Sequence, residues 1–305
     1  MSHSTHTYND DDRNQGILIN IDGELFPRHE AKVSVFDSAF MLGDGVWEGL
    51  RVHHGKVAFL QTHLDRLYAG AKSLDFHPGL TQEELTQRIY QTLEGNNMSE
   101  GVHLRLMVSR GTKSTPYQDP RVTITAPTIV IVPEYKEALP ETVTKGVNLF
   151  TVHVRRGFPD VQDPKLNSHS KINCILACIQ ATKAGADEAL MLDPFGFVAT
   201  CNSTHFFIVK DNKVMTSTGQ FCIDGVTRGA VLRICREQGI EHDQTAFSLS
   251  DVYNADEAFV TGTFAGLVPV CSVDGREIGN GGRGPMVEQL QQHYMELLDQ
   301  ECRNA

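Results

Sequence analysis

The sequence predicts an α+β fold with two domains, and three observations support this prediction. Strand-like and helix-like segments are interspersed without the strict βαβ rhythm of a parallel, doubly wound sheet. No internal repeat is visible. A polar, proline-containing stretch at 134–146 separates two halves, as an interdomain linker does. The expected parts are a disordered leader at 1–15, a small N-terminal domain at 16–137, a linker at 138–147 and a larger C-terminal domain at 148–305.

The elements of the first half follow from turn residues and periodicity. The pair Asp22-Gly23, between two short β-type runs, is a strong signal for a two-residue hairpin. Apolar residues at helical spacing predict amphipathic surface helices, and continuous apolar runs predict strands. The segment 111–127 carries proline and glycine and is long enough to suggest a functional loop. The predicted helices are 64–74 and 85–93, and the predicted strands are 102–108 and 128–132.

The second half is predicted from the same signals. A proline-bearing loop precedes a helix at roughly 170–183, and Ile172, Ile175, Leu176 and Ile179 give this helix one apolar stripe. A second helix starts near Thr227, and a closing helix covers 286–298. The predicted strands are 147–154, 189–192, 205–210, 214–216 and 256–261.

Composition excludes several classes of partner. A formal net charge of −11, with 38 acidic against 27 basic residues, disfavours nucleic acid. The longest apolar stretches are strand-length, well short of the roughly 20 residues that cross a bilayer, so no membrane partner is expected. The polar leader has no signal-peptide core. Seven scattered cysteines suit a reducing compartment, which indicates the cytoplasm.

Two glycine-bearing segments suggest a phosphate site. Gly225-Val-Thr-Arg precedes a predicted helix, where free main-chain amides and the Thr227 hydroxyl can bind an anion. By itself this pattern is better explained as an ordinary helix cap by Thr227. The segment Thr261-Gly-Thr-Phe-Ala-Gly266 adds hydroxyls and close backbone approach. Arg51 is a further candidate for a phosphate partner, although alone it reads as a surface arginine.

These segments, together with Asp44-Gly-Val-Trp-Glu-Gly-Leu-Arg51 and His63-Leu-Asp-Arg-Leu67, resemble the class IV aminotransferases. The resemblance covers about residues 16–296. It implies a fold type IV enzyme, with a small α/β domain, a pseudo-barrel domain, pyridoxal 5'-phosphate (PLP) at their interface and a homodimer. It also implies an amino donor and a keto acceptor as small-molecule partners. Matched position by position, the residues of the phosphate cup are Arg51, Gly225, Val226, Thr227 and Thr263.

The sequence departs from the family at the lysine that forms the Schiff base with PLP. Aligned without gaps, Asn167 stands at the lysine position and Lys171 at a tyrosine position four residues later. A flexible lysine there could still reach the cofactor, so Lys171 is the first candidate for the nucleophile. Lys165, two residues before Asn167, is the second. An exposed lysine opening a helix is the alternative interpretation of Lys171.

A second departure concerns the pyridine nitrogen of PLP. Thr200 stands where family aminotransferases carry a glutamate, and a neutral hydroxyl supports a protonated ring less than a carboxylate does. His169 is a candidate proton shuttle because an unperturbed imidazole titrates near neutrality. A hydrogen-bonded loop histidine is the alternative. Cys174 and Cys178 lie one helical turn apart and are interpreted as packing residues, not metal ligands.

Substrate recognition is predicted for four further side chains. Arg105 matches an arginine that in branched-chain enzymes helps to recognise the substrate carboxylate. The loop 110–121 resembles one that reaches the partner subunit's pocket, and Lys113, Tyr117 and Arg121 are its candidate carboxylate ligands. Ordinary solvated loop charges are the alternative. The predicted function is a branched-chain-type aminotransferase acting on a small amino acid or amine. The alternatives are a PLP-dependent lyase or racemase and a non-catalytic protein that binds PLP or another phosphorylated ligand.

Overall fold

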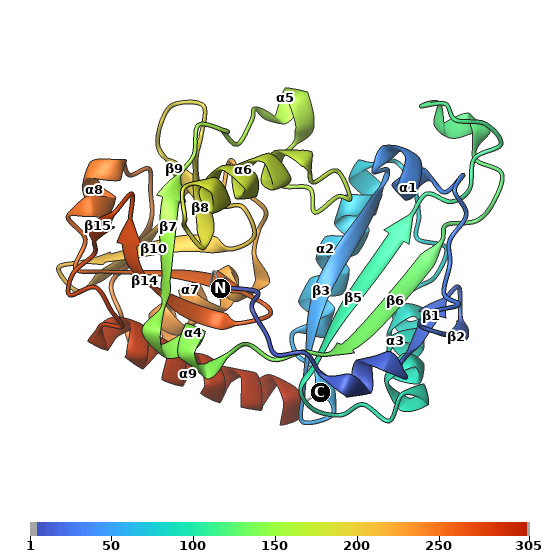
Figure 1. The fold of residues 1–305 in the computed structure, drawn as a ribbon, viewed down its shortest axis with the longest axis horizontal. Coiled ribbons are helices and arrows are strands. Elements are labelled where there is room, and N and C mark those ends of the chain that lie inside the picture. The colour runs from blue at the N-terminus through green and yellow to red at the C-terminus, as the bar shows by residue number, and fades with distance from the viewer. Residues whose placement is uncertain (1–4, 304–305) are drawn as a thin grey trace. The chain divides into compact units, whose positions relative to one another are not determined.

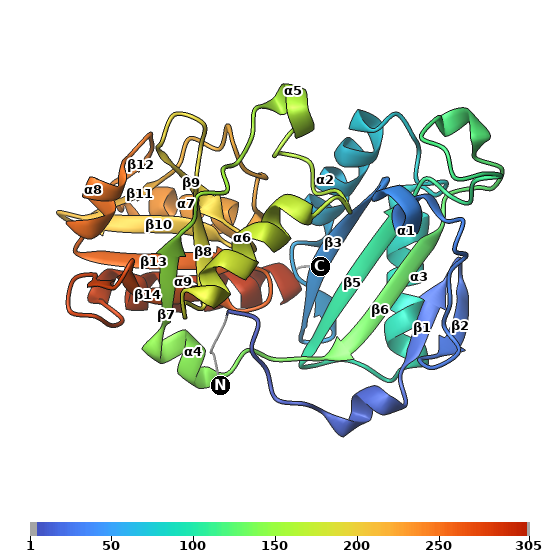
Figure 2. The ribbon, with the colours of Figure 1, turned by 45° about the horizontal axis from the view of Figure 1, so that its top comes forward.

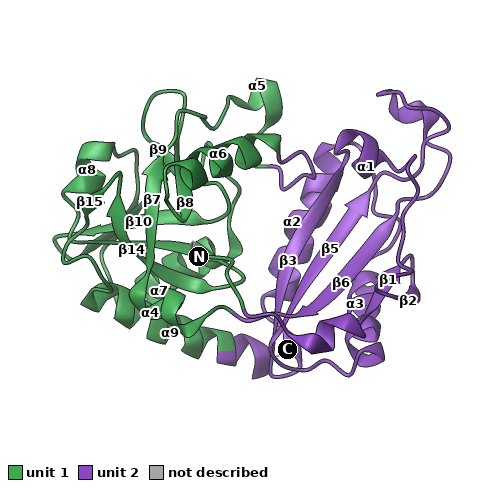
Figure 3. Cartoon of the chain, in the orientation of Figure 1, with its two compact units in different colours: residues 1–8, 138–165, 172–298 green, residues 9–137, 166–171, 299–305 purple. Residues whose placement is uncertain are grey.

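The computed structural model describes residues 5–303, which divide into two compact units (Figure 3). Unit 1 contains residues 5–8, 138–165 and 172–298, and unit 2 contains 9–137, 166–171 and 299–303. The units differ from the predicted domains because short segments such as 5–8, 166–171 and 299–303 belong to a different unit from the residues next to them in the sequence. In the predicted linker, Pro140–Lys145 forms helix α4 and belongs to unit 1.

Unit 2 is an antiparallel sheet with helices packed against one face (Figure 1). Within the described residues the strand order is β2-β1-β6-β5-β3-β4. The strands are β1 (Leu18–Ile21), β2 (Glu24–Pro27), β3 (Gly45–His53), β4 (Lys56–Val57), β5 (Val102–Ser109) and β6 (Ile129–Tyr135). The helices are η1 (Asp12–Gln15), α1 (Ser38–Leu42), α2 (Leu60–Ser73), α3 (Gln82–Gly95) and η2 (Pro120–Val122).

The turn residues between strands and the alternation of buried and exposed side chains along them explain how the sheet of unit 2 forms. The predicted hairpin is confirmed, since β1 pairs with β2 around Asp22 and Gly23, both at positive φ. Helices α2 and α3 cover the same face of the sheet (Figure 2) and bury leucines against it. In β3, Val46, Leu50 and Val52 face this core. The odd-numbered residues of β3 therefore lie on the opposite face, away from the helices.

Unit 1 is built on a mixed sheet curled into a half-barrel, with strand order β12-β11-β10-β13-β14-β7-β8-β9 and β15 on β14 among the described residues. A core cluster on this sheet consists of aliphatic and aromatic side chains such as Val147, Phe206 and Val268. On the other side of β10, Phe207 stacks on Phe259 with ring centroids 4.8 Å apart. The strands are β7 (Val147–Thr151), β8 (Glu188–Leu192), β9 (Val198–Cys201), β10 (His205–Lys210), β11 (Lys213–Thr216), β12 (His242–Gln244), β13 (Glu257–Gly262), β14 (Gly266–Val273) and β15 (Arg276–Glu277). The helices besides α4 are α5 (Pro159–Gln162), α6 (Ile172–Lys183), α7 (Val226–Gln238), α8 (Leu249–Tyr253) and α9 (Pro285–Arg303).

Helix α6 turns its apolar stripe outward. Ala177 and Ala181 are its buried residues, and they pack on β7 and β8. Cys178 is exposed, so the interpretation of this cysteine as a packing residue is wrong. Small residues let the helix lie close to the sheet, which leaves the larger side chains on the outer side. The exposed stripe consists of Ile172, Ile175, Leu176 and Ile179.

The predicted leader carries contacts wherever it is described. Residues 1–4 lie outside the described residues. Thr5 is buried and its hydroxyl donates to the Glu188 carboxylate (2.9 Å), while Asn14 bonds to the main chain of Tyr135. Residues 5–15 therefore differ from the predicted disorder, because their polar side chains find partners far along the chain. Among residues 5–303, no helix is both long enough and apolar enough to cross a membrane.

Candidate functional site

The segment 166–171 belongs to unit 2 because it pairs with the start of β3. The main-chain N–H of Trp47 donates to the carbonyl of Asn167 (3.1 Å), and that of His169 donates to the carbonyl of Gly45 (2.9 Å). The indole N–H of Trp47 donates to the carbonyl of Ser168 (3.0 Å). These bonds fix the segment that contains the predicted nucleophile on the edge of the sheet.

The side-chain amide of Asn167 forms hydrogen bonds through both its nitrogen and its oxygen. Its Nδ2 donates to the carbonyl of Trp47 (2.6 Å), which orients Oδ1 toward the Lys171 amine. The Nζ of Lys171 donates to Oδ1 at 3.1 Å. Asn167 is 6% exposed and has no nucleophilic amine, since the amide lone pair is delocalised into the carbonyl. The Lys171 amine is therefore held directly beside residue 167, where the resemblance to the family places the lysine.

Trp47 forms a platform for two cations. The Nζ of Lys171 lies 5.2 Å from a Trp47 ring centroid, and the guanidinium carbon of Arg105 lies 3.7 Å from one. A cation over an aromatic face is stabilised by about 0.5 to 1 kcal/mol at an exposed site and by about 2 kcal/mol or more when desolvated. Sequence reasoning missed this role of Trp47. The available signal was that the only tryptophan of the chain lies within the segment resembling the family motif.

The two candidate lysines have different surroundings. Lys165 is exposed and belongs to unit 1, and its backbone N–H donates to the side chain of Asp163. Lys171 is half-buried and held by Asn167 and Trp47. A positioned amine is better suited to nucleophilic chemistry than a solvated one.

His169 lines a cavity in unit 2. The cavity has a volume of about 370 Å³, and its polar edge includes Asp37 and Ser109, with apolar side chains such as Met107 around it. The Nε2 of His169 is buried and has no hydrogen-bond partner among the described residues. Burial lowers the pKa of His169, so its imidazole is neutral near pH 7. A neutral ring with an unsatisfied nitrogen can exchange a proton with a molecule in this cavity.

The three candidate residues of the loop 110–121 lie in different surroundings. Lys113 is 1% exposed, and its Nζ donates to the carbonyl of Asp119 (3.2 Å), an arrangement that holds the loop together. Arg121 forms an exposed ion pair with the Asp119 carboxylate. Tyr117 is 55% exposed. The structure therefore does not gather these three side chains into one carboxylate site.

The predicted phosphate-binding residues of unit 1 surround the start of α7. Gly225 is the N-cap of this 13-residue helix, and no side chain caps it, which leaves the first amides of α7 available to an anion. Thr227, in the first turn, is buried. Thr263 lies half-buried in the turn between β13 and β14. Arg51 lies in β3 of unit 2, on the same face as Trp47 by strand alternation.

A buried polar cluster supports the start of α7, and the sequence analysis did not find it. A Cβ on Gly225 would lie 2.8 Å from Nδ1 of His205, so only glycine fits there without displacement. The Nε2 of His205 lies 3.3 Å from Sγ of Cys222. Arg228 donates to the carbonyl of Ser217. The Nε of Arg228 and the hydroxyl of Thr261 are buried without a partner among the described residues, which fits a site that receives an anion.

Thr200 is oriented by its own turn. It is 5% exposed, and its hydroxyl donates to the carbonyl of Thr204 (2.8 Å). With its proton used there, the oxygen can act only as an acceptor toward another group. A neutral acceptor can receive a bond from a protonated ring nitrogen, but it adds no negative charge to favour that protonation. The residues present therefore fit PLP, with a weaker partner for its nitrogen than a carboxylate.

Comparisons with known proteins identify a family for this chain. Residues 45–273 match the family model described as amino-transferase class IV. The chain is 39% identical over 286 residues to branched-chain-amino-acid aminotransferase-like protein 2 of Arabidopsis thaliana, covering 94% of this chain and 51% of the plant protein. The chain thus spans about half the length of this relative.

Two further comparisons cover nearly the whole of both chains. A branched-chain-amino-acid aminotransferase of Pseudomonas aeruginosa is 32% identical over 285 residues, which is 91% of each chain. The crystal structure of a branched-chain amino acid aminotransferase with pyridoxamine 5'-phosphate superimposes with a TM-score of 0.87 at 30% identity. The superposition covers 93% of this chain and 95% of that one. The similarity includes both units.

Proposed function

Because the chain belongs to the class IV aminotransferase family, we propose that it is a PLP-dependent aminotransferase of the branched-chain type in which Lys171 carries the cofactor. The proposed partners are a small amino donor and a keto acceptor. When bound, PLP supplies the electron sink for chemistry at the Cα atom of an amino acid. The protein must then supply phosphate binding, an amine and proton transfer.

Each of these tasks has a candidate residue in the chain. The uncapped amides at the start of α7 and the hydroxyls of Thr227 and Thr263 would bind the phosphate, and Arg51 is the proposed charge partner. The oxygen of Thr200, whose proton is donated to Thr204, would accept a bond from the ring nitrogen. Arg105 remains the proposed partner of a substrate carboxylate.

The observation that carries the proposal is the position of the Lys171 amine. It lies 3.1 Å from Asn167 Oδ1 and near the face of Trp47, so its four-carbon stem is ordered before any ligand arrives. Lys171 then serves as both nucleophile and proton carrier, with His169 as a second proton carrier.

The test is covalent trapping of the cofactor. Purified protein is incubated with PLP, its visible spectrum is recorded, and it is reduced with borohydride and digested for peptide mapping. We expect label on Lys171, loss of label in Lys171→Ala, and retention in the matched control Lys165→Ala. Label on Lys165 would overturn the assignment of Lys171.

Turnover is tested separately from trapping. Conversion of a branched-chain amino acid to its keto acid, dependent on an added keto acceptor, supports transamination. Ammonia release without an acceptor contradicts it and indicates elimination. Binding of PLP without any reducible adduct contradicts catalysis altogether.

We further propose a homodimer located in the cytoplasm. The apolar stripe of α6 is exposed along its full length, as a helix face covered by a second copy would be. Replacing Ile175 by glutamate should yield a smaller species in size-exclusion chromatography with light scattering. All seven cysteines are unpaired within the described residues, which is consistent with a reducing compartment.

A further inference from the structure

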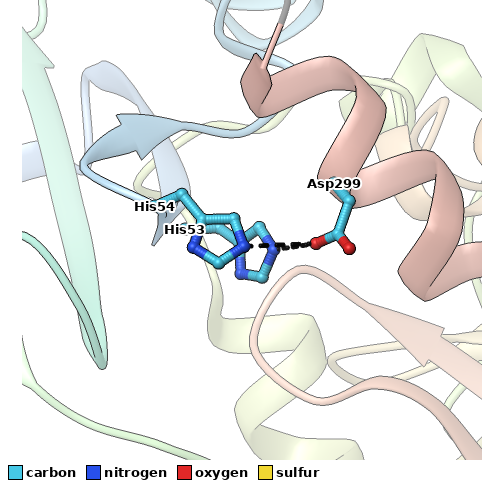
Figure 4. A group of neighbouring side chains, drawn as sticks. All are labelled: His53, His54 and Asp299. Atoms are coloured by element: carbon cyan, nitrogen blue, oxygen red, sulfur yellow. Dashed lines mark hydrogen bonds and ion pairs between the residues drawn. The ribbon is translucent and has the colours of Figure 1, made fainter.

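Three side chains of unit 2 converge at the turn between β3 and β4 (Figure 4). His53 ends β3, His54 follows it in the turn, and Asp299 lies in the last turns of α9. The Nε2 of His53 is 2.5 Å and the Nε2 of His54 is 3.5 Å from the same oxygen, Oδ1 of Asp299. One ligand atom from each residue lies within 4.8 Å of the other two.

The backbone of the turn brings adjacent histidines to one side. Consecutive side chains of a regular strand point to opposite faces. Here His54 has φ 51° and Gly55 has φ 72°, so the strand ends and the second ring swings back beside the first. The two ring centroids are 4.1 Å apart, and both rings face Asp299 (Figure 4). A left-handed histidine at this turn is thus what creates the cluster.

The carboxylate of Glu100 orients the ring of His54, the more exposed of the two histidines. The Nδ1 of His54 lies 3.2 Å from Oε1 of Glu100. If Nδ1 carries the proton in this bond, Nε2 keeps its lone pair, and that nitrogen is the one directed at Asp299. Histidine metal ligands usually make such a bond through their other nitrogen. The second oxygen of Asp299, Oδ2, is 3.9 Å from Arg303 and leaves Oδ1 for the cluster.

From this geometry we propose that His53, His54 and Asp299 bind a divalent transition-metal ion of the zinc class, with solvent completing its coordination. Two imidazoles and one carboxylate suit zinc and its neighbours, whereas magnesium and calcium prefer oxygen ligands. Ligand atoms of a tetrahedral zinc ion lie about 3.4 Å apart, given bonds of roughly 2.1 Å. The His54 to Asp299 distance already matches. The His53 to Asp299 distance must open by about 1 Å, which the 37% exposed side chain of Asp299 permits.

The ion would join parts of unit 2 that are distant in sequence. Residues 299–303 of α9 belong to unit 2, whereas the preceding residues of this helix belong to unit 1. A metal bond to Asp299 would fasten this end of α9 to the β3–β4 turn. The predicted consequence is a metal-dependent increase in thermal stability, because an ion that binds only the folded state stabilises that state.

The experiment is calorimetric titration of the tag-free, PLP-loaded full-length protein with zinc chloride after removal of metals. We expect one zinc ion per chain. His54→Ala and Asp299→Asn should each abolish this site, and Glu100→Gln should weaken it about tenfold. The matched control is His293→Ala, which removes another histidine that pairs with a carboxylate on α9 and should leave zinc binding unchanged.

The result is independent of the proposed aminotransferase activity, because metal stoichiometry is measured without turnover. Absence of saturable zinc binding in the wild type would overturn the proposal. So would equal zinc affinity in the wild type, His54→Ala and Asp299→Asn. Both replaced side chains are partly exposed, and circular dichroism of the variants verifies that the fold is retained.

Discussion

Replacing Glu48 by glutamine should destabilise unit 2 by about 3 kcal/mol. Glu48 is fully buried on the core face of β3. Its carboxylate accepts bonds from Nε and Nη2 of Arg66 (2.8 and 2.6 Å) and from Nδ1 of His63 (2.7 Å). The variant keeps the shape of the side chain but removes the charge and turns an amide N–H₂ toward donors.

The magnitude follows from what remains after the change. Breaking a buried ion pair by removing one partner costs about 3 to 5 kcal/mol, because the other charge stays buried without compensation. The Arg66 side chain is 18% exposed, so water recovers part of that cost. The lower end of the range therefore applies.

Tryptophan fluorescence during urea unfolding is the assay. Trp47 is the only tryptophan of the chain and the neighbour of Glu48, so its emission reports on unit 2. With a urea dependence of about 2 kcal/mol per molar, the unfolding midpoint should fall by about 1.5 M. Asp119→Asn is the control, because its ion pair with Arg121 is exposed and screened by solvent, so its loss should shift the midpoint little. A Glu48→Gln shift no larger than that of the control would refute the reasoning.

Three further outcomes are expected. Gly225→Ala should weaken PLP binding in a spectroscopic titration by roughly tenfold, about 1.4 kcal/mol, because the new Cβ would clash with His205. Gly229→Ala on the same helix is the control: its Cβ would contact no other atom, so PLP binding should be unchanged. Thr200→Glu should raise the transamination kcat about 5- to 30-fold, since a charged hydrogen bond exceeds a neutral one by about 1 to 2 kcal/mol. Burial lowers the pKa of both His63 and His169 in the folded protein. The unfolded chain therefore binds more protons than the folded chain below about pH 6.5, and the urea midpoint should fall as the pH decreases from 7 to 5. This fall should be less steep in His169→Gln, which lacks one of the two imidazoles.

Local signals in the sequence accounted for most elements. The Asp22-Gly23 turn, the periodicity of the long helices and the apolar strand runs each depend on neighbouring residues, and the structure contains all of them with shifted ends. The glycine before α7 was also readable, because an uncapped helix start preceded by glycine is a local pattern. Short elements such as β9, β12 and α8 carry too few residues to produce a period and were not predicted. The longer strands β3 and β14 were not predicted either.

Features that depend on distant residues could not be predicted. The ion pair of Glu48 with Arg66 joins a strand to a helix, and the burial of Lys113 depends on how its loop folds back on Asp119. The stripe of α6 was identified correctly, but periodicity alone does not tell which side of a helix faces the core. There the small residues Ala177 and Ala181 decided the packing.

We propose that Asn167 and Lys171 act as a pair. An amide at 167 can donate to the carbonyl of Trp47 and accept from the Lys171 amine at the same time, and a lysine at 167 could not accept at all. An aspartate could accept, but its charge would favour the ammonium form of Lys171, which is not nucleophilic, and would leave the Trp47 carbonyl without this donor. Asparagine at 167 therefore positions the Lys171 amine without adding a negative charge that would keep it protonated, as the proposed role of Lys171 as nucleophile requires.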